Sequence, residues 1–256
     1  MSNFGLMKSD QELEEEIKNL GIEYRYSCYR EKNAEGCDYL ANFLEIVEKD
    51  YKKSSEVYRD NCLNNNYGKS CHHYASNLFV GRAFAKDLKA AEKMFERGCT
   101  LGFGDSCYMS GYMKFNIDEN GKNTTESDRE KGIKEWTKGC DIKHEKSCLS
   151  LSNLFLFGKY GVLKNMEKAF EFTTKSCELN DYSACKNLSM LYKHGLGIER
   201  NDEKAEFYHK KFEDLYQDYA NTEGLYDMEK FTDEKKGLLE KLKQLSPFKK
   251  ENTTQS

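Results

Sequence analysis

Ten cysteines that fall into five local pairs constrain the fold of this chain more than any other feature. In four of the pairs, the first cysteine follows an aspartate or asparagine by twelve residues, and its partner stands eight or nine residues further on. The pairs are Cys28 and Cys37, Cys62 and Cys71, Cys99 and Cys107, Cys140 and Cys148, and Cys177 and Cys185. The second cysteines are spaced 34, 36, 41 and 37 residues apart, which is typical of helix-pair repeats. We therefore expect an elongated array in which each unit packs mainly on its neighbours.

The composition favours helices throughout. The chain has one proline in 256 residues and is rich in good helix formers such as Lys, Glu, Ala and Leu. We predict an all-α fold, an α/α solenoid of helix pairs, each joined by a local disulfide. Ser9 and Glu12 form a capping-box pattern that predicts a helix starting at Asp10, and Gly21 is expected to end that helix.

Helix caps and small residues recur in register with the cysteines. The predicted N-caps are Asp50, Asp87, Asp128, Asn165 and Asn201. Small residues at matched positions would let helix backbones approach closely; they are Ala41, Ala75, Gly111, Ser152 and Ser189 after the second cysteines, and Ser54, Ala91, Gly132, Ala169 and Ala205 after the caps. Larger apolar residues beside them, among them Leu40, Tyr58, Phe95, Trp136 and Phe172, are expected to form a continuous core without a single centre.

Three segments follow from the extent of the repeats. Residues 1–8 are expected to be a flexible leader, residues 9–220 a repeat solenoid of about five helix pairs, and residues 221–256 a C-terminal helix with a disordered tail. Near the start of the last segment, we predict a linker at Ala220–Gly224, followed by a charged helix at Thr232–Gln244. Asn116–Glu126 is a polar insertion that accounts for the 41-residue spacing, and we expect it to be mobile.

Charge and hydropathy exclude some functions. The net charge of −4 arises from interspersed Lys and Glu, without a basic stripe, so nucleic-acid binding is disfavoured. No apolar run approaches the ~18 residues of a membrane span. The regular cysteine pairs favour an oxidising compartment, yet the N-terminus is polar and acidic rather than a secretory signal or a transit peptide. The mitochondrial intermembrane space reconciles both observations; the cytosol is the alternative.

Three kinds of chemistry are open to the cysteines. Each pair stands at the end of one helix and the start of the next, so a local disulfide is the favoured reading and would stabilise the fold by roughly 2.5 kcal/mol. Structural zinc usually takes cysteines two to four residues apart, whereas seven or eight residues separate these. Thiol-disulfide exchange is the third reading, because the second cysteine of each pair begins a helix, where a thiol pKa is lowered.

Haem binding is a further alternative, since a His and a Met can supply axial ligands. The histidines are His72, His73, His144, His194 and His209, and the methionines near them in sequence are Met109, Met113 and Met190. The competing interpretation is that the methionines fill core gaps and the histidines lie at surfaces or turns. We predict no catalytic residue and no metal site, and cofactor ligands stay unassigned.

The repeats carry a family resemblance. The segments KDLKAAEKMFERGC, KNMEKAFEFTTKSC and NLSMLYKHGLGIERNDEKA resemble Sel-one-like repeats, a subclass of tetratricopeptide-type helix pairs. YSCYREKNAEGCDYLANFLE and VYRDNCLNNNYGKSC, with the three later cysteine pairs, are similar to the cytochrome c oxidase assembly factor 7 family. The resemblance covers about residues 10–215. Secreted bacterial β-lactam-binding proteins with cysteine-bridged repeats are a more distant alternative.

The resemblance implies a soluble protein of the intermembrane space that supports biogenesis of respiratory complex IV and enters through the disulfide-relay import machinery. We predict a non-enzymatic, monomeric scaffold that binds protein partners, since a rigid surface lowers the entropic cost of binding. A thiol-disulfide reductase or a haem-binding protein acting in the same assembly process is the alternative.

Overall fold

The computed structural model describes residues 9–115 and 125–229, with side chains described through residue 221. All regular structure in these ranges is α-helical, which confirms the predicted class. The helices are α1 (Asp10–Tyr29), α2 (Ala34–Ile46), α3 (Tyr51–Asn64), α4 (Gly68–Val80), α5 (Leu88–Thr100), α6 (Gly104–Phe115), α7 (Glu126–Asp141), α8 (Glu145–Phe157), α9 (Met166–Glu178), α10 (Tyr182–His194) and α11 (Asp202–Glu229).

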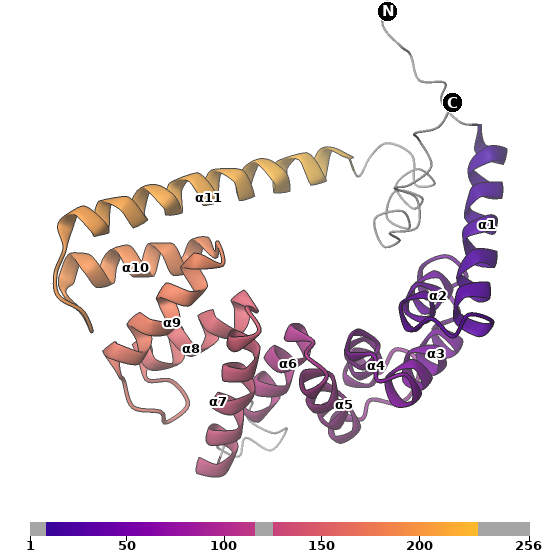
Figure 1. Ribbon diagram of the computed structural model, residues 1–256, viewed down its shortest axis with the longest axis horizontal. Helices are drawn as coiled ribbons and strands as arrows, with labels where there is room; N and C mark the ends of the chain where they lie inside the picture. Colours follow the sequence, from indigo (N-terminus) through magenta and orange to yellow (C-terminus); the bar gives the residue numbers. More distant parts are fainter. Residues whose placement is uncertain (1–8, 116–124, 230–256) are drawn as a thin grey trace, which may run out of the picture. The chain divides into compact units, whose positions relative to one another are not determined.

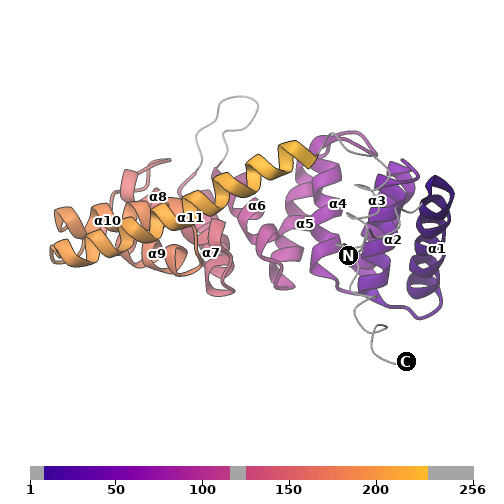
Figure 2. The ribbon, with the colours of Figure 1, turned by 90° about the horizontal axis from the view of Figure 1, so that it is seen from above.

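The chain divides into two compact units. Among the described residues, unit 1 comprises 9–65 and 223–229, and unit 2 comprises 66–115 and 125–222. Within unit 1, α2 packs on both α1 and α3. Within unit 2, each helix from α4 to α10 packs on its neighbours in sequence, and the most extensive contacts join α4 with α5, α6 with α7, and α8 with α9 (Figures 1 and 2). The pairs that a disulfide joins, α5 with α6, α7 with α8 and α9 with α10, also pack together, as the repeats predict.

The start of α1 is as predicted, but its end is not. Ser9 accepts a hydrogen bond from the Glu12 N–H, and the Glu12 carboxylate accepts one from the Ser9 N–H, which confirms the capping box. The prediction that Gly21 ends the helix is wrong, because α1 continues to Tyr29. Gly21 is buried, and a Cβ there would lie 2.6 Å from the Phe43 ring of α2. This glycine therefore permits close helix packing.

Four of the five predicted caps are confirmed. Asp50, Asp87 and Asn165 accept hydrogen bonds from the first turns of α3, α5 and α9, and Asn201 accepts one from the Lys204 N–H. Asp128 is wrong as an N-cap, because Thr125 caps α7 and Asp128 is its capping-box partner inside the first turn. The helix therefore begins three residues earlier than predicted, since a threonine hydroxyl also serves as an N-cap and Asp128 at the third helical position completes the capping box.

The core alternates the smallest residues with the largest rings. In unit 2, a Cβ on Gly111 of α6 would lie 2.3 Å from the Trp136 ring of α7, and a Cβ on Gly132 would lie 2.4 Å from the Phe115 ring. The Phe115 and Trp136 rings stack with centroids 4.6 Å apart. The small residues predicted from the sequence thus leave room for an aromatic ring of the facing helix to pack against the helix backbone. The described core of unit 2 consists of three hydrophobic clusters, and that of unit 1 of one.

The last helix, α11, differs from the predicted segmentation. Ala220–Gly224 is helical, so its assignment as a linker is wrong: a single glycine costs a helix only about 1 kcal/mol. Within unit 2, α11 packs on α10, with the Tyr192 and Tyr208 rings stacked 5.6 Å apart (Figure 2). Glu213 stands twelve residues after the Asn201 cap, where the earlier repeats have a cysteine, and its Oε1 lies 3.6 Å from His209 Nε2. The leader 1–8, residues 116–124 of the insertion and the Thr232–Gln244 helix lie outside the described residues.

Candidate functional site

The cysteine bridges occupy one repeated position in the fold. The first cysteine stands in the last turn of one helix, and the second is the fourth residue of the next. The structure joins Cys28 to Cys37, Cys99 to Cys107, Cys140 to Cys148 and Cys177 to Cys185, with Cα atoms 4.3, 4.4, 4.7 and 4.7 Å apart. Cys62 and Cys71 stand on either side of the unit boundary, and their pairing stays a prediction.

Small residues directly before the cysteines make these close approaches feasible, and the sequence analysis missed them. A Cβ on Gly98 would lie 2.3 Å from Ser106 Oγ, and a Cβ on Gly139 would lie 2.3 Å from Ser147 Oγ. In unit 1, a Cβ on Gly36 would lie 2.4 Å from Ser27 Oγ. The available signal was that Ser, Gly, Asn or Ala precedes every cysteine.

The bridges are inaccessible to an attacking thiol in the folded state. Each bridged cysteine is at most 5 % exposed, and both members of the Cys177–Cys185 bridge are fully buried. Disulfide exchange requires a thiolate to reach a sulfur atom. The arrangement therefore suits structural cross-links better than exchange catalysis.

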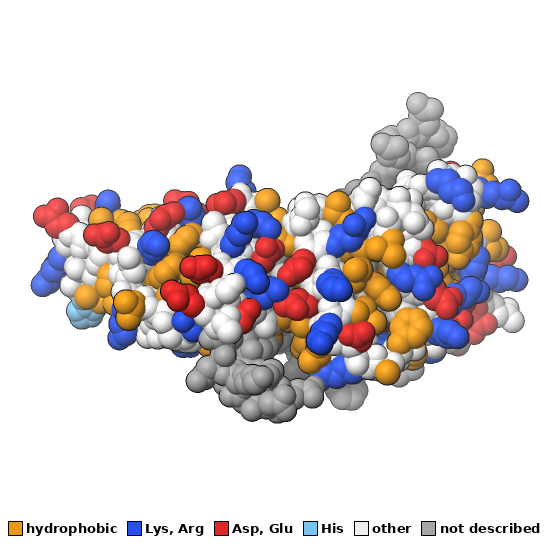
Figure 3. Space-filling view, turned by 90° about the horizontal axis from the view of Figure 1, so that it is seen from below, with side chains coloured by type: hydrophobic (Ala, Val, Ile, Leu, Met, Phe, Trp, Pro, Cys, Tyr) orange, Lys and Arg blue, Asp and Glu red, His pale blue; other side chains and the backbone are white. Residues whose placement is uncertain are grey.

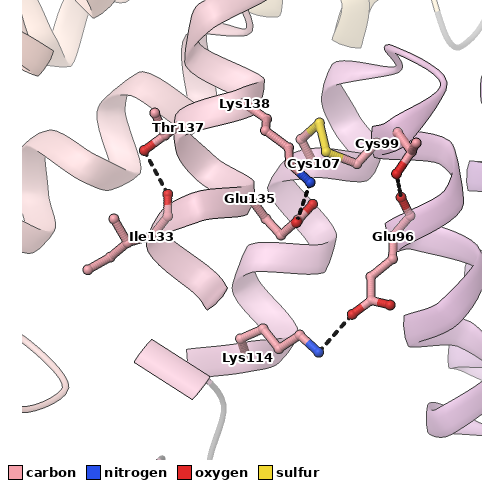
Figure 4. A network of polar contacts seen from close by, with 9 residues as sticks. Glu96, Cys99, Cys107, Lys114, Ile133, Glu135, Thr137 and Lys138 are labelled. Atoms are coloured by element: carbon pink, nitrogen blue, oxygen red, sulfur yellow. Dashed lines mark hydrogen bonds and ion pairs between the residues drawn. A yellow bond between two sulfur atoms is a disulfide. The ribbon is translucent and has the colours of Figure 1, made fainter. Parts of the chain in front are cut away.

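An ion-pair cluster joins α5 and α6 away from their disulfide, and Figure 4 shows its Lys114–Glu96 pair. The Lys114 ammonium lies 2.6 Å from the Glu92 carboxylate and 2.8 Å from that of Glu96. Burial alone would lower the pKa of Lys114, but its hydrogen bonds with the two carboxylates outweigh burial and raise it. The Cys99–Cys107 bridge and this cluster therefore fix the same helix pair at two separate places.

Of the candidate haem ligands, His72 and His144 are packed against neighbouring side chains. The His72 ring lies 5.3 Å from those of both Phe95 and Phe103. His144 contacts Ser147 Oγ through Nδ1 at 2.9 Å and Asp105 through Nε2 at 3.3 Å. Hydrogen bonding from His144 lowers the pKa of Asp105.

The remaining candidate ligands are dispersed. His73 stands beside His72 with ring centroids 5.9 Å apart, while His194 ends α10. Met109 and Met113 pack against the cluster around Phe95, and Met190 is half exposed. Among the described residues, no group of three His, Cys, Asp or Glu side chains is placed to hold a metal ion.

Acidification is expected to destabilise the fold through His72. Burial, chiefly, and the neighbouring His73 lower the pKa of His72 from 6.5 to about 4. In the unfolded chain His72 binds a proton near pH 6.5, whereas in the folded chain it does so only near pH 4. The folded state therefore loses stability relative to the unfolded state as the pH falls through this window. The loss from this group is at most ~3 kcal/mol. Urea unfolding across the window measures it.

The control for this prediction is His72→Phe, which keeps a ring between Phe95 and Phe103 but has no proton to take up. The variant should show a shallower dependence of unfolding free energy on pH between about 4 and 6.5, while the other ionisable groups of the chain are left in place. An unchanged slope would assign the pH dependence to those groups.

Comparison with known proteins connects this geometry to a family. The Sel1 repeat matches residues 65–103, 146–181 and 183–215. Cytochrome c oxidase assembly factor 7 of Xenopus tropicalis is 34 % identical over 215 residues, which cover 82 % of this chain and 91 % of that protein. The chain belongs to the cytochrome c oxidase assembly factor 7 family. The Homo sapiens cytochrome c oxidase assembly factor 7 is 35 % identical over 217 residues, with coverage of 82 % and 92 %.

A solved structure supports the fold of this assembly factor 7 family member. A Sel1 repeat protein from Oxalobacter formigenes superposes with a TM-score of 0.63 at 15 % identity, covering 81 % of this chain and 85 % of the other. That likeness concerns the fold alone. No helix among the described residues is long and apolar enough to cross a membrane.

Proposed function

We propose that this protein is a mitochondrial assembly factor for cytochrome c oxidase, respiratory complex IV, and acts as a disulfide-stabilised protein-binding scaffold. The observation that carries the proposal is the similarity to assembly factors over 82 % of the chain. The relatives are named for assembly of the oxidase, and helix-pair arrays typically act by presenting an extended surface to partners.

We place the protein in the intermembrane space. Structural disulfides persist in oxidising compartments, and four buried bridges recur at one position of the repeat. Import by the disulfide relay follows from the same pairs, because oxidation during entry would lock each helix pair. In isolated mitochondria, the chain should become sensitive to added protease only after the outer membrane is ruptured. Sensitivity in intact mitochondria, or protection in mitoplasts, would contradict this location.

The scaffold role favours recognition over chemistry. The bridged cysteines are buried, so exchange with a substrate thiol would require local unfolding. The Lys114 cluster and the disulfides hold successive helices in fixed relation, so little conformational entropy remains to be lost on binding. We therefore propose that protein partners are bound by the folded, oxidised monomer.

Depletion of the protein is expected to lower cytochrome c oxidase activity and assembled complex IV several-fold, while succinate dehydrogenase activity stays unchanged. Re-expression of the wild-type chain should restore both readouts. Normal levels of assembled oxidase after complete depletion would overturn the proposed function.

Bridge-by-bridge replacement separates a scaffold from a thiol-disulfide reductase. Paired Cys→Ser variants, such as Cys140→Ser with Cys148→Ser, should restore oxidase assembly in proportion to the amount of folded protein. A reductase would instead show one pair whose replacement abolishes rescue although the variant accumulates and folds like the wild type.

A further inference from the structure

The loop that joins α8 to α9, residues 158–165, presents unusually exposed hydrophobic side chains. Leu163 is 87 % exposed, more than any other large hydrophobic residue in the described part of the chain. Tyr160, in the same loop, and Phe157, which precedes it, are 46 % and 50 % exposed. Figure 1 shows the loop projecting away from the two helices that it joins. Three hydrophobic side chains within seven residues therefore face solvent on a protrusion.

The backbone hydrogen bonds hold the loop in this conformation. The Val162 N–H donates to the Lys159 carbonyl at 3.0 Å, and the two residues between them, Tyr160 and Gly161, have φ angles of +56° and +77°. Two successive positive φ angles inside such a bond mark a type I′ turn. The Tyr160 ring also lies 5.2 Å from that of Phe115. Exposure of the loop is thus a property of an ordered turn.

The other repeats show that the fold does not require a hydrophobic residue at this place. Asp87, Asn165 and Asn201 are the N-caps of α5, α9 and α11 in unit 2. Two residues before these caps stand Ala85, Leu163 and Glu199 respectively. Alanine and glutamate thus serve at equivalent positions, so the fold does not require a hydrophobic residue where Leu163 stands.

Positive charge accompanies the exposed hydrophobic residues. The Lys159 ammonium lies 5.5 Å over the Phe157 ring, and Lys164 directly follows Leu163. Among the described residues, neither lysine forms a salt bridge, whereas the equivalent of Lys164 in the next repeat, Arg200, pairs with Asp202 at 2.9 Å. Elsewhere, on the face shown in Figure 3, acidic and basic side chains alternate. The loop therefore combines hydrophobic side chains with two cations that have no carboxylate partner in the part of the chain that the structure describes.

We propose that the α8–α9 loop docks the protein onto the surface of an anionic phospholipid bilayer. Leu163, Phe157 and Tyr160 would enter the interface, where aromatic side chains are favoured, and Lys159 and Lys164 would contact the headgroup phosphates. These features favour a bilayer over a protein partner, because protruding hydrophobic side chains can enter lipid without a complementary pocket. The proposal goes beyond oxidase assembly and does not depend on it.

Vesicle co-sedimentation with the full chain tests the proposal. The protein should sediment with vesicles of phosphatidylcholine and phosphatidylglycerol, and much less with phosphatidylcholine alone, and added salt should weaken the binding. Leu163→Glu, which copies Glu199, should weaken vesicle affinity at least tenfold. Replacing Lys159 and Lys164 together by alanine should also weaken it about tenfold or more, since each cation near an anionic surface contributes about 1 kcal/mol.

Phe207→Glu is the matched control. Phe207 is 63 % exposed on α11, and Glu171 holds the equivalent position in α9, so the change removes another strongly exposed hydrophobic side chain at a different place. Its vesicle affinity should equal that of the wild type. Leu163→Ala, which copies Ala85, replaces Leu163→Glu if the latter does not fold. Wild-type protein that stays in the supernatant with anionic vesicles, or equal affinities for the Leu163 and Phe207 variants, would overturn the proposal.

A third outcome would point to a protein partner instead. If the wild type does not bind vesicles but Leu163→Glu fails to restore oxidase assembly in depleted cells, the loop contacts a protein, and lipid docking is overturned. Vesicle binding is measured without the oxidase, so its failure would not contradict the proposed role in oxidase assembly. A failure of that role would likewise not contradict lipid docking.

Discussion

Gly197→Ala is expected to lower the free energy of unfolding by about 3 kcal/mol or more. Gly197 lies in the α10–α11 loop at a φ of +75°, where an alanine is strained. A Cβ there would also stand 2.1 Å from the Met166 carbonyl oxygen and 2.4 Å from its carbon. Because both atoms belong to the backbone at the start of α9, relief requires movement of a loop or a helix. Urea unfolding monitored by circular dichroism measures the loss.

Gly102→Ala separates the two causes. Gly102 has a similar φ of +83°, but no atom lies within 4 Å of a Cβ built on it. This variant should lose only the backbone contribution, about 1 kcal/mol. The difference between the two variants then reports the steric contact with Met166. Equal losses in both variants would show that the α10–α11 loop can move away from Met166 at little cost, and that its packing against α9 contributes little to stability.

Gly111→Ala is expected to cost about 2–3 kcal/mol, because the new methyl group would overlap the Trp136 ring. Trp136 is buried and its Nε1 donates to the Tyr108 carbonyl at 2.9 Å, so the ring cannot move aside without losing this bond. Trp136→Phe alone should cost about 1–2 kcal/mol through a cavity and the lost hydrogen bond.

The double variant, Gly111→Ala with Trp136→Phe, copies the Ala75 and Phe95 combination of the preceding repeat, where both residues are completely buried in one cluster. The double variant should lose less unfolding free energy than the two single variants together, by at least about 1 kcal/mol, since the smaller ring makes room for the methyl group. Strict additivity in this double-mutant cycle would mean that the two positions do not share space. Unfolding of all four proteins under the same conditions gives the coupling.

Periodic features of the sequence predicted the fold well. The helix-pair class, the positions of the cysteines at helix ends, and the caps at Asp50, Asp87, Asn165 and Asn201 all follow from local chemistry that repeats. Errors arose where one residue type has two uses. Gly21 does not end α1; it makes room for the Phe43 ring. Asp128 is not the N-cap of α7, because Thr125 caps this helix.

Sites that depend on neighbours in space were less predictable. Nothing in the local sequence indicates that His72 lies between Phe95 and Phe103, because both rings come from another helix or its following turn. Likewise, the exposure of Leu163 depends on the turn that precedes it, and hydrophobic periodicity alone would assign a leucine to the core. Comparison between equivalent loops, Ala85 and Glu199 against Leu163, carries information that the loop by itself does not.

The placement of each bridge across a single helix-helix turn also determines how the oxidised chain reaches its correct pairing. Cys148 is eight residues from Cys140, whereas Cys107, the nearest preceding cysteine, is 33 residues away. Closing the shorter loop costs about 1.2 kcal/mol less entropy, which corresponds to a roughly eightfold higher effective concentration of the native partner. Oxidation before folding therefore already favours the native bridges, and each helix pair can be locked without waiting for the rest of the chain.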